Sequence, residues 1–109
     1  MIITTITGML TEVSAITYAG DAKRPIQRIR LAVAPVADAL GRFNEKPNYF
    51  DVFIYGEKEI SEAWAGHNDK HPSRFVTVQA QLVGRLKADA SGKLYNNITL
   101  RLKKITFND

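Results

Sequence analysis

Cysteine is absent from the 109 residues of this chain. A disulfide framework and a thiolate metal site are therefore excluded, and the absence suits a reducing compartment. No apolar run approaches the roughly 18 residues that a membrane-spanning helix needs. The N-terminal segment lacks the basic region and long apolar stretch of a signal peptide. These absences favour a cytoplasmic protein that has no contact with a membrane.

Positive charge is only slightly in excess of negative charge. The chain has 15 Lys and Arg against 11 Asp and Glu, a net charge of +4. A mildly basic balance is compatible with a phosphate-binding face but does not require one. The content of 45% hydrophobic and 24% charged residues indicates a folded chain with one core. We expect a single domain over residues 1–109.

Five segments have the pattern of a strand. Apolar and polar residues alternate in them with period two, and β-branched residues are frequent, as in half-buried strands. The predicted strands cover residues 2–13, 24–34, 49–55, 74–86 and 94–107. Gly8, in the middle of the first strand, predicts a bulge or a sharp bend of the kind that barrel closure requires.

One helix is predicted between the third and fourth strands. It begins at Glu57, with acidic residues in its first turn, and ends at Gly66. Ile60, Ala63 and Trp64 make one apolar face, so Trp64 is assigned to the core. Three strands, a helix and two strands in this order predict an all-β fold. We expect a five-stranded OB-fold barrel with the helix covering one end.

Four short segments carry a resemblance that spans essentially the whole chain. They are residues 6–10 (ITGML), 29–34 (IRLAVA), 50–56 (FDVFIYG) and 76–82 (VTVQAQL). In this order the chain resembles the bacterial single-stranded DNA-binding protein family, including its short relative, primosomal replication protein N. The resemblance implies an OB fold, binding of single-stranded DNA, no cofactor, and assembly into a homodimer or homotetramer.

The resemblance also points to particular residues. Tyr49 stands where the family often has a base-stacking tryptophan, and Tyr55 where it has a stacking phenylalanine. Phe43 lies in the loop segment that contributes another stacking tryptophan. Where the family has one more aromatic residue, this chain has Leu86 and Lys87. In this departure it resembles primosomal replication protein N, which relies more on basic contacts. The sequence ends after its last strand, so recruitment of partners through an acidic tail is not expected unless the chain has been shortened.

The residues themselves also suggest a nucleic-acid face. Single strands need cations for their phosphates and flat side chains for their bases. Alternation puts Tyr49, Phe53 and Tyr55 on one side of their strand, together with Asp51, whose charge would repel phosphate. The candidate cations are Lys23, Arg24, Arg28, Arg30, Arg42, Lys46, Arg85, Lys87, Lys93, Arg101 and Lys103. Strand aromatics are also found in cores and interfaces, the role favoured for Phe53, and single basic residues are most often solvated surface.

No pattern of catalytic residues is found. A nucleophile elbow, a phosphate-binding glycine loop and paired catalytic carboxylates are missing, so we expect neither an enzyme nor a bound cofactor. His67 and His71 are four residues apart with Asp69 between them. They lie in a proline-containing linker without a helix to align them, which argues against a metal site.

Threonines in the first strand, Thr4, Thr5 and Thr7, suit pairing with a second copy of the chain. The leading hypothesis is sequence-independent binding of single-stranded DNA in replication, repair or transfer of mobile DNA. The alternative is a primosome-type protein-interaction module with weak affinity for single strands and with replication or primosome proteins as partners. A third possibility is an OB domain for structured RNA or another ligand.

Overall fold

The computed structural model describes residues 1–34, 40–41, 46–65, 67 and 74–108. Within these residues the chain forms six strands and one helix. They are β1 (Ile2–Val13), β2 (Thr17–Ala19), β3 (Arg24–Val33), β4 (Asn48–Tyr55), α1 (Glu57–Trp64), β5 (Phe75–Ala88) and β6 (Leu94–Phe107). The predicted sequence of three long strands, a helix and two long strands is confirmed.

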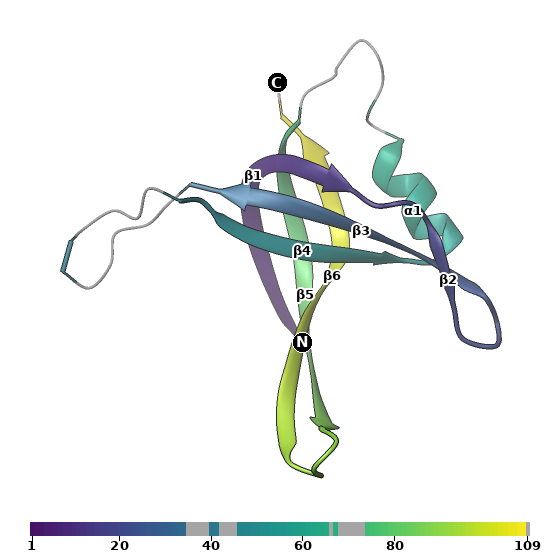
Figure 1. Cartoon of the computed structure of the whole chain (residues 1–109). Coiled ribbons are helices and arrows are strands. Elements are labelled where there is room, and N and C mark those ends of the chain that lie inside the picture. The colour runs from purple at the N-terminus through teal and green to yellow at the C-terminus, as the bar shows by residue number, and fades with distance from the viewer. Residues whose placement is uncertain (35–39, 42–45, 66, 68–73, 109) are drawn as a thin grey trace.

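The long strands close into a ring in the order β1-β5-β6-β4-β3, and β3 pairs back with β1. β1 closes the ring because it has two partners. Residues 2–9 pair antiparallel with β5, and residues 9–13 pair antiparallel with β3. Figure 1 shows β1 curving over to reach both neighbours. On the other side of the ring, β4 and β6 run parallel, with Val52 opposite Leu100.

Gly8 lies at the point where β1 bends from one partner to the other. A Cβ atom at this position would lie 2.5 Å from the carbonyl oxygen of Ala32 in β3. Only a residue without a side chain allows the two backbones to approach this closely. The pairing passes from β5 to β3 at Met9, so β1 changes direction next to Gly8, whereas the bulge in this strand lies between Leu10 and Glu12.

The core is built from the inward side chains of every long strand. Its largest fully buried members are Ile29, Leu31, Val52, Ile54, Val76 and Val78. α1 contributes the buried Ile60 and Ala63 to this cluster, and Trp64 packs against it. The core role predicted for Trp64 is confirmed. Since these side chains alternate with outward ones, the burial of one face fixes which residues each strand presents to solvent.

A chain of hydrogen bonds ties α1 to the sheet. The indole Nε1 of Trp64 donates to Oε1 of Gln27 at 2.8 Å, and Nε2 of Gln27 donates to the carbonyl oxygen of Ser14 at 3.0 Å. Gln27 is the buried polar residue of the described chain, so these bonds satisfy groups that would otherwise be destabilising. They fix the helix over one end of the barrel.

Two local features differ from the predicted pattern. The strand β2 was not predicted, because three residues are too few to show a period; it pairs with the start of β3 to form a hairpin. The alternation predicted for residues 94–107 breaks near Lys103. Gln79 pairs with Lys104 and Ala80 pairs with Leu102, so Lys103 is an extra residue in a bulge. It therefore does not continue the row of side chains that contains Arg101.

The bend at Gly8 gives a test of barrel closure. Gly8→Ala brings a methyl group against the Ala32 carbonyl, and we expect the free energy of unfolding to fall by about 1–3 kcal/mol, as in other overpacked sites. Gly84→Ala is the matched control, since its Cβ would meet only Asn96 Oδ1 at 3.4 Å. The control should change stability by less than about 0.5 kcal/mol. Equal urea denaturation curves for the two variants would contradict the role of Gly8.

Candidate nucleic-acid interface

A groove of about 530 Å³ lies between the end of β4 and the outward side of the β5–β6 hairpin. It is lined by Arg24, Tyr55, Val83, Arg85, Leu86, Lys87, Asn97, Thr99 and Arg101, and we call it the basic groove. Four of these side chains are cationic, and none of the described residues that line the groove is acidic. A concave surface with charge of one sign concentrates its field on ligands of the opposite sign.

Tyr55 and Arg101 form the centre of the basic groove. Cζ of Arg101 lies 5.3 Å from the centroid of the Tyr55 ring, within the range of a cation–π contact. The ring of Phe53 stacks against Tyr55, with the centroids 6.3 Å apart and the planes inclined at 28°. The parallel register of β4 and β6, which sets Phe53 opposite Arg101, brings these groups together. Flat rings and a guanidinium thus share one place on the sheet.

The β5–β6 hairpin extends the groove beyond the barrel, toward the bottom of Figure 1. Arg85 lies opposite Asn97, and Lys87 lies opposite Tyr95. Paired residues point to the same side of a two-stranded sheet, so all four share the side that lines the groove. Neither Arg85 nor Lys87 forms an ion pair with any residue that the structure describes. Their charges are therefore available to an anionic ligand.

A turn held by Asp89 closes the hairpin. The carboxylate of Asp89 accepts a hydrogen bond from the Ser91 hydroxyl at 2.7 Å and from the backbone N–H groups of Ser91 and Lys93, each at 2.9 Å. The Ser91 hydroxyl, followed by the Lys93 N–H, lowers the pKa of Asp89 below its ordinary value. The turn sets Lys93 at the tip of the hairpin, with its side chain exposed.

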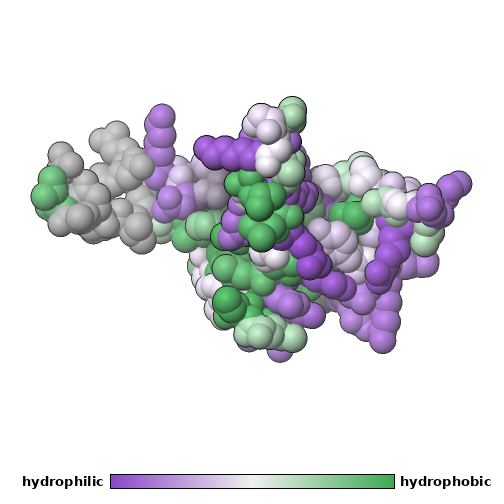
Figure 2. Space-filling view, turned by 90° about the horizontal axis from the view of Figure 1, so that it is seen from below, coloured by the Kyte–Doolittle hydropathy of each residue, from purple (hydrophilic) through white to green (hydrophobic). Residues whose placement is uncertain are grey.

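The opposite side of the same hairpin is apolar. Leu94 and Ile98 alternate with the groove residues, as does Leu86, which also borders the groove, and all three are largely exposed. Ile2, at the start of β1, is also exposed and pairs with Leu82 of β5. Seen from below, hydrophobic side chains gather over the middle of the molecule, while hydrophilic ones dominate on the right, toward the β2–β3 hairpin (Figure 2). The hairpin thus has one cationic and one apolar side.

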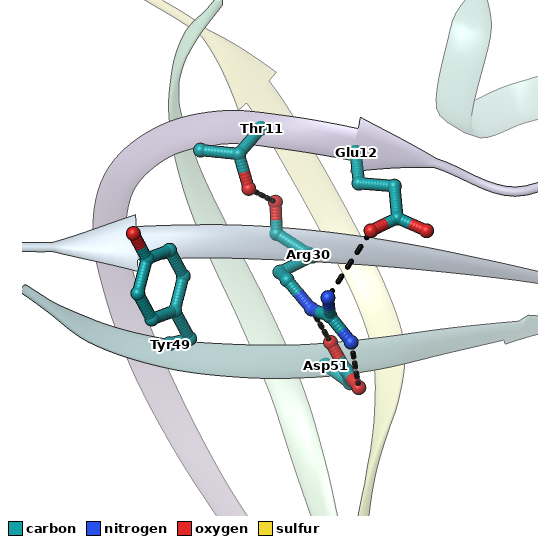
Figure 3. Close-up of a pocket in the computed structure, with 5 residues that line it drawn as sticks. All are labelled: Thr11, Glu12, Arg30, Tyr49 and Asp51. Atoms are coloured by element: carbon teal, nitrogen blue, oxygen red, sulfur yellow. Dashed lines mark hydrogen bonds and ion pairs between the residues drawn. The ribbon is translucent and has the colours of Figure 1, made fainter.

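Four charged side chains pair with one another on the outward face of β1, β3 and β4. Arg30 donates through Nε to Oδ1 of Asp51 at 2.8 Å, through Nη2 to Oδ2 at 3.2 Å, and through Nη1 to Oε2 of Glu12 at 3.1 Å. Arg28 donates to Glu12 and, at 3.4 Å, to Oδ2 of Asp51. We call Glu12, Arg28, Arg30 and Asp51 the charge quartet, and Figure 3 shows three of its members.

The electrostatics of the charge quartet follow from these contacts. The hydrogen bond from Arg30, together with its positive charge, lowers the pKa of Asp51 despite partial burial, and the same bond raises the pKa of Arg30. Two positive and two negative groups sum to no net charge. Tyr49 lies beside the quartet and is 58% exposed. It lines a second pocket, of about 540 Å³, with Thr11 and three quartet members (Figure 3).

The structure separates the predicted site residues into groups. Tyr55, Phe53, Arg85, Lys87 and Arg101 lie in or beside the basic groove, and Lys93 lies at the hairpin tip. Tyr49 is set apart from Tyr55 by the charge quartet, which contains Arg28 and Arg30. Lys103 lines a different hollow, with Glu59 and Glu62 of α1, and Lys46 is exposed just before β4. Arg42 and Phe43 lie outside the described residues.

Several residues in or beside the groove were not among the predicted site. Asn97 and Thr99 line the groove, and Tyr95 lies beside it. The signal for these three was present in the sequence, because they alternate along their strand in step with Arg101. Their significance depends on the β5–β6 pairing, which sets Tyr95 next to Lys87.

Neither a metal-binding cluster nor a membrane-spanning helix is found among the described residues. Among the described residues, no group of three or more His, Cys, Asp or Glu side chains is placed to hold a metal ion. His67 packs against the rings of Trp64 and Phe107, whereas His71 and Asp69 lie outside the described part of the chain. The described helix is not long and apolar enough to cross a membrane.

Solved structures of single-stranded DNA-binding proteins are similar to this one. The mitochondrial protein from S. cerevisiae matches with a TM-score of 0.61 and 17% identity over 96% of this chain and 92% of its own. A deletion mutant of the Thermus aquaticus protein matches with a TM-score of 0.64 and 20% identity. This match covers 98% of our chain but only 49% of the other. The small protein from Streptomyces coelicolor gives 0.55 and 20%, over 98% and 94% of the two chains.

These likenesses define the fold. Although these structures are only 17–20% identical to it in sequence, the chain has the OB fold of single-stranded DNA-binding proteins, with a closed ring of strands and one helix. No protein family and no curated protein matches the sequence itself. The three structures named above give no support to the expected relation to primosomal replication protein N, which stays a prediction.

The lowered pKa of Asp51 predicts how stability depends on pH. Because the pKa of Asp51 is below its ordinary value of 3.8 in the folded state, its ionised form stabilises the fold above that value. This contribution is lost as the pH falls through the folded pKa. We expect Asp51→Asn to be less stable than the unmodified protein at neutral pH. The difference should shrink as the pH is lowered from about 5, where carboxylates begin to protonate.

Urea denaturation across this pH range measures the effect, with Glu62→Gln as a control. Glu62 is an exposed carboxylate whose pairing with Lys58, at 3.9 Å, is weak. A stability difference for Asp51→Asn that does not change with pH would contradict the assignment.

Proposed function

We propose that this chain binds single-stranded DNA without sequence preference, and that it does so in the basic groove. The OB fold that it shares with three single-stranded DNA-binding proteins supports this proposal. The observation that carries it is the ring of Tyr55 beside Arg101. The groove around them has three further cationic side chains and no acidic one among the described residues that line it.

The chemistry of the groove suits an unpaired strand. Aromatic rings stack on the faces of exposed bases, and cations neutralise the phosphates between them. Bases in a duplex are already stacked on one another, so Tyr55 and Phe53 have little to bind there. Every base has a flat face, and stacking is therefore tolerant of sequence.

The proposed path of the strand follows the outward side of the β5–β6 hairpin. From Arg101 to Tyr95 it spans six residue-to-residue steps of β6, or about 20 Å at roughly 3.3 Å per step. Thr99 and Asn97 lie between them and offer hydrogen bonds to phosphate or base. Tyr95 provides a second flat surface beside Lys87, and Lys93 adds a charge at the tip.

A protein that covers single strands without reading their sequence suits the intermediates of replication, repair or transfer of mobile DNA. We propose one of these processes as the setting in which this chain acts. Weak DNA binding combined with a tight complex with a replication or primosome protein would instead favour a protein-interaction module.

Substitution of Tyr55 tests the groove. Tyr55→Ala removes a stacking surface, and we expect the affinity for labelled oligo-dT to fall at least about fivefold, since stacking contributes about 1–3 kcal/mol per base. Fluorescence anisotropy measures it at low and high salt, with duplex DNA as competitor. Tyr18→Ala is the matched control, because Tyr18 is an exposed tyrosine of β2 outside the groove. Equal losses for the two variants, or equal competition by duplex, would exclude the proposed site.

We also propose that the chain forms a homodimer or homotetramer. The exposed apolar residues of β1 and of the hairpin support this proposal, since contiguous exposed apolar surface commonly marks an interface. They are Ile2, Leu86, Leu94 and Ile98, which share one side of the β1–β5–β6 sheet. Sedimentation equilibrium should give a mass of two or four chains at micromolar concentration. A monomer under these conditions would refute the assembly without affecting the DNA-binding groove.

A further inference from the structure

We propose that the charge quartet is an intramolecular lock that keeps Arg28 and Arg30 from DNA phosphates and confines the strand to the basic groove. This inference rests on the proposed binding of single-stranded DNA. It assigns Asp51 and Glu12 a role in specificity: they determine which cations of the outward face take part in binding.

The geometry of Arg30 is the first argument. Its Nε and Nη2 donate parallel hydrogen bonds to the two carboxylate oxygens of Asp51, and its Nη1 donates to Glu12. A guanidinium binds phosphate in the same two-pronged way. The carboxylate of Asp51 therefore occupies the donor edge that a phosphate would need. A phosphate that approaches Arg30 must displace a hydrogen-bonded partner that is already in place.

The sheet register is the second argument. Asp51 lies directly opposite Arg30 in the β3–β4 pair, and Glu12 is opposite Arg30 in the β1–β3 pair. Side chains at directly opposed positions are within a few ångströms of each other whether or not a ligand is present. The two carboxylates are thus held near the guanidinium at a high effective concentration, which a phosphate on a separate molecule must overcome.

The contrast in charge is the third argument. The four quartet side chains are between 26% and 46% exposed, so their contacts are screened less than those of freely solvated groups. Their charges cancel. Arg85 and Lys87 of the basic groove have no acidic partner among the described residues. A polyanion is therefore attracted along the hairpin rather than along β4 toward Tyr49.

Loss of a carboxylate should open a second path. In Asp51→Asn, Arg28 and Arg30 each lose one of their two acidic partners and keep only Glu12 as a counter-charge. Arg28 is paired with Phe53, which stacks on Tyr55, and Arg30 is paired with Asp51, so both arginines lie along β4 from the proposed binding position at Tyr55. Each additional phosphate contact steepens the dependence of log affinity on log salt by about 0.7 for single strands.

The test is the salt dependence of oligo-dT binding, measured by anisotropy between low and moderate salt. We expect Asp51→Asn to bind more tightly at low salt and to steepen the slope by about 0.7–1.4, for one or two added contacts. Glu12→Gln should act in the same direction and keeps the test open if Asp51→Asn fails to fold. Glu62→Gln makes the same change in net charge on α1 and should leave the slope unchanged.

The opposite results overturn the lock. Unchanged or weaker binding in folded Asp51→Asn and Glu12→Gln would mean that the quartet does not withhold its arginines. An equal gain in Glu62→Gln would mean that net charge alone is responsible.

Two further measurements separate failure of the lock from failure of the proposed function. Arg85→Gln removes one groove cation and should lower the slope by about 0.7. An unchanged slope in this variant would refute the path through the groove, while the withholding of Arg28 and Arg30 is still decided by the slopes of Asp51→Asn and Glu12→Gln. If the unmodified protein does not bind oligo-dT, elution from a heparin column decides. Later elution of Asp51→Asn than of Glu62→Gln supports the lock, and equal elution overturns it.

Discussion

The change of partner along β1 is the constraint on which the rest of the structure depends. One strand must leave β5 and join β3 within a few residues, and Gly8 allows this because its backbone lies against that of Ala32. Ring closure then decides which residues share a face. It brings Glu12 onto the arginines of β3, and it brings β6 beside β4, so that Arg101 meets Tyr55. The neutral and the basic parts of the outward face both result from this closure.

Most of the fold could be predicted from the sequence, because burial of one face imposes period two on every long strand. The strand over residues 94–107 was located to the residue, and Trp64 was correctly placed in the core. The prediction failed where local pattern carries no information. β2 is too short for a period, and the bulge at Lys103 depends on how β6 fits against β5 rather than on β6 alone.

The candidate site was less accessible to prediction, because it depends on contacts between distant segments. Parity placed Tyr55, Phe53 and Arg101 on outward faces, but only the parallel register of β4 and β6 makes them neighbours. The sequence likewise places Arg28 and Arg30 on the outward face, where they were predicted to act as cations. Their pairing with Asp51 requires the register of β3 and β4, and their pairing with Glu12 requires the far end of a bent strand. The order of charged residues in the sequence therefore does not predict which charges are paired on the folded surface.

The position of Trp64 has a practical consequence. Its indole is hydrogen-bonded to Gln27 and packs beside Phe107. Its fluorescence therefore reports on the packing of α1 against the barrel. The basic groove is lined by other elements and contains tyrosine instead. Since the chain has a single tryptophan, its intrinsic emission is a spectroscopic probe of barrel integrity that is separate from events in the groove. Unfolding and ligand occupancy can thus be followed as two independent optical signals in one unlabelled sample.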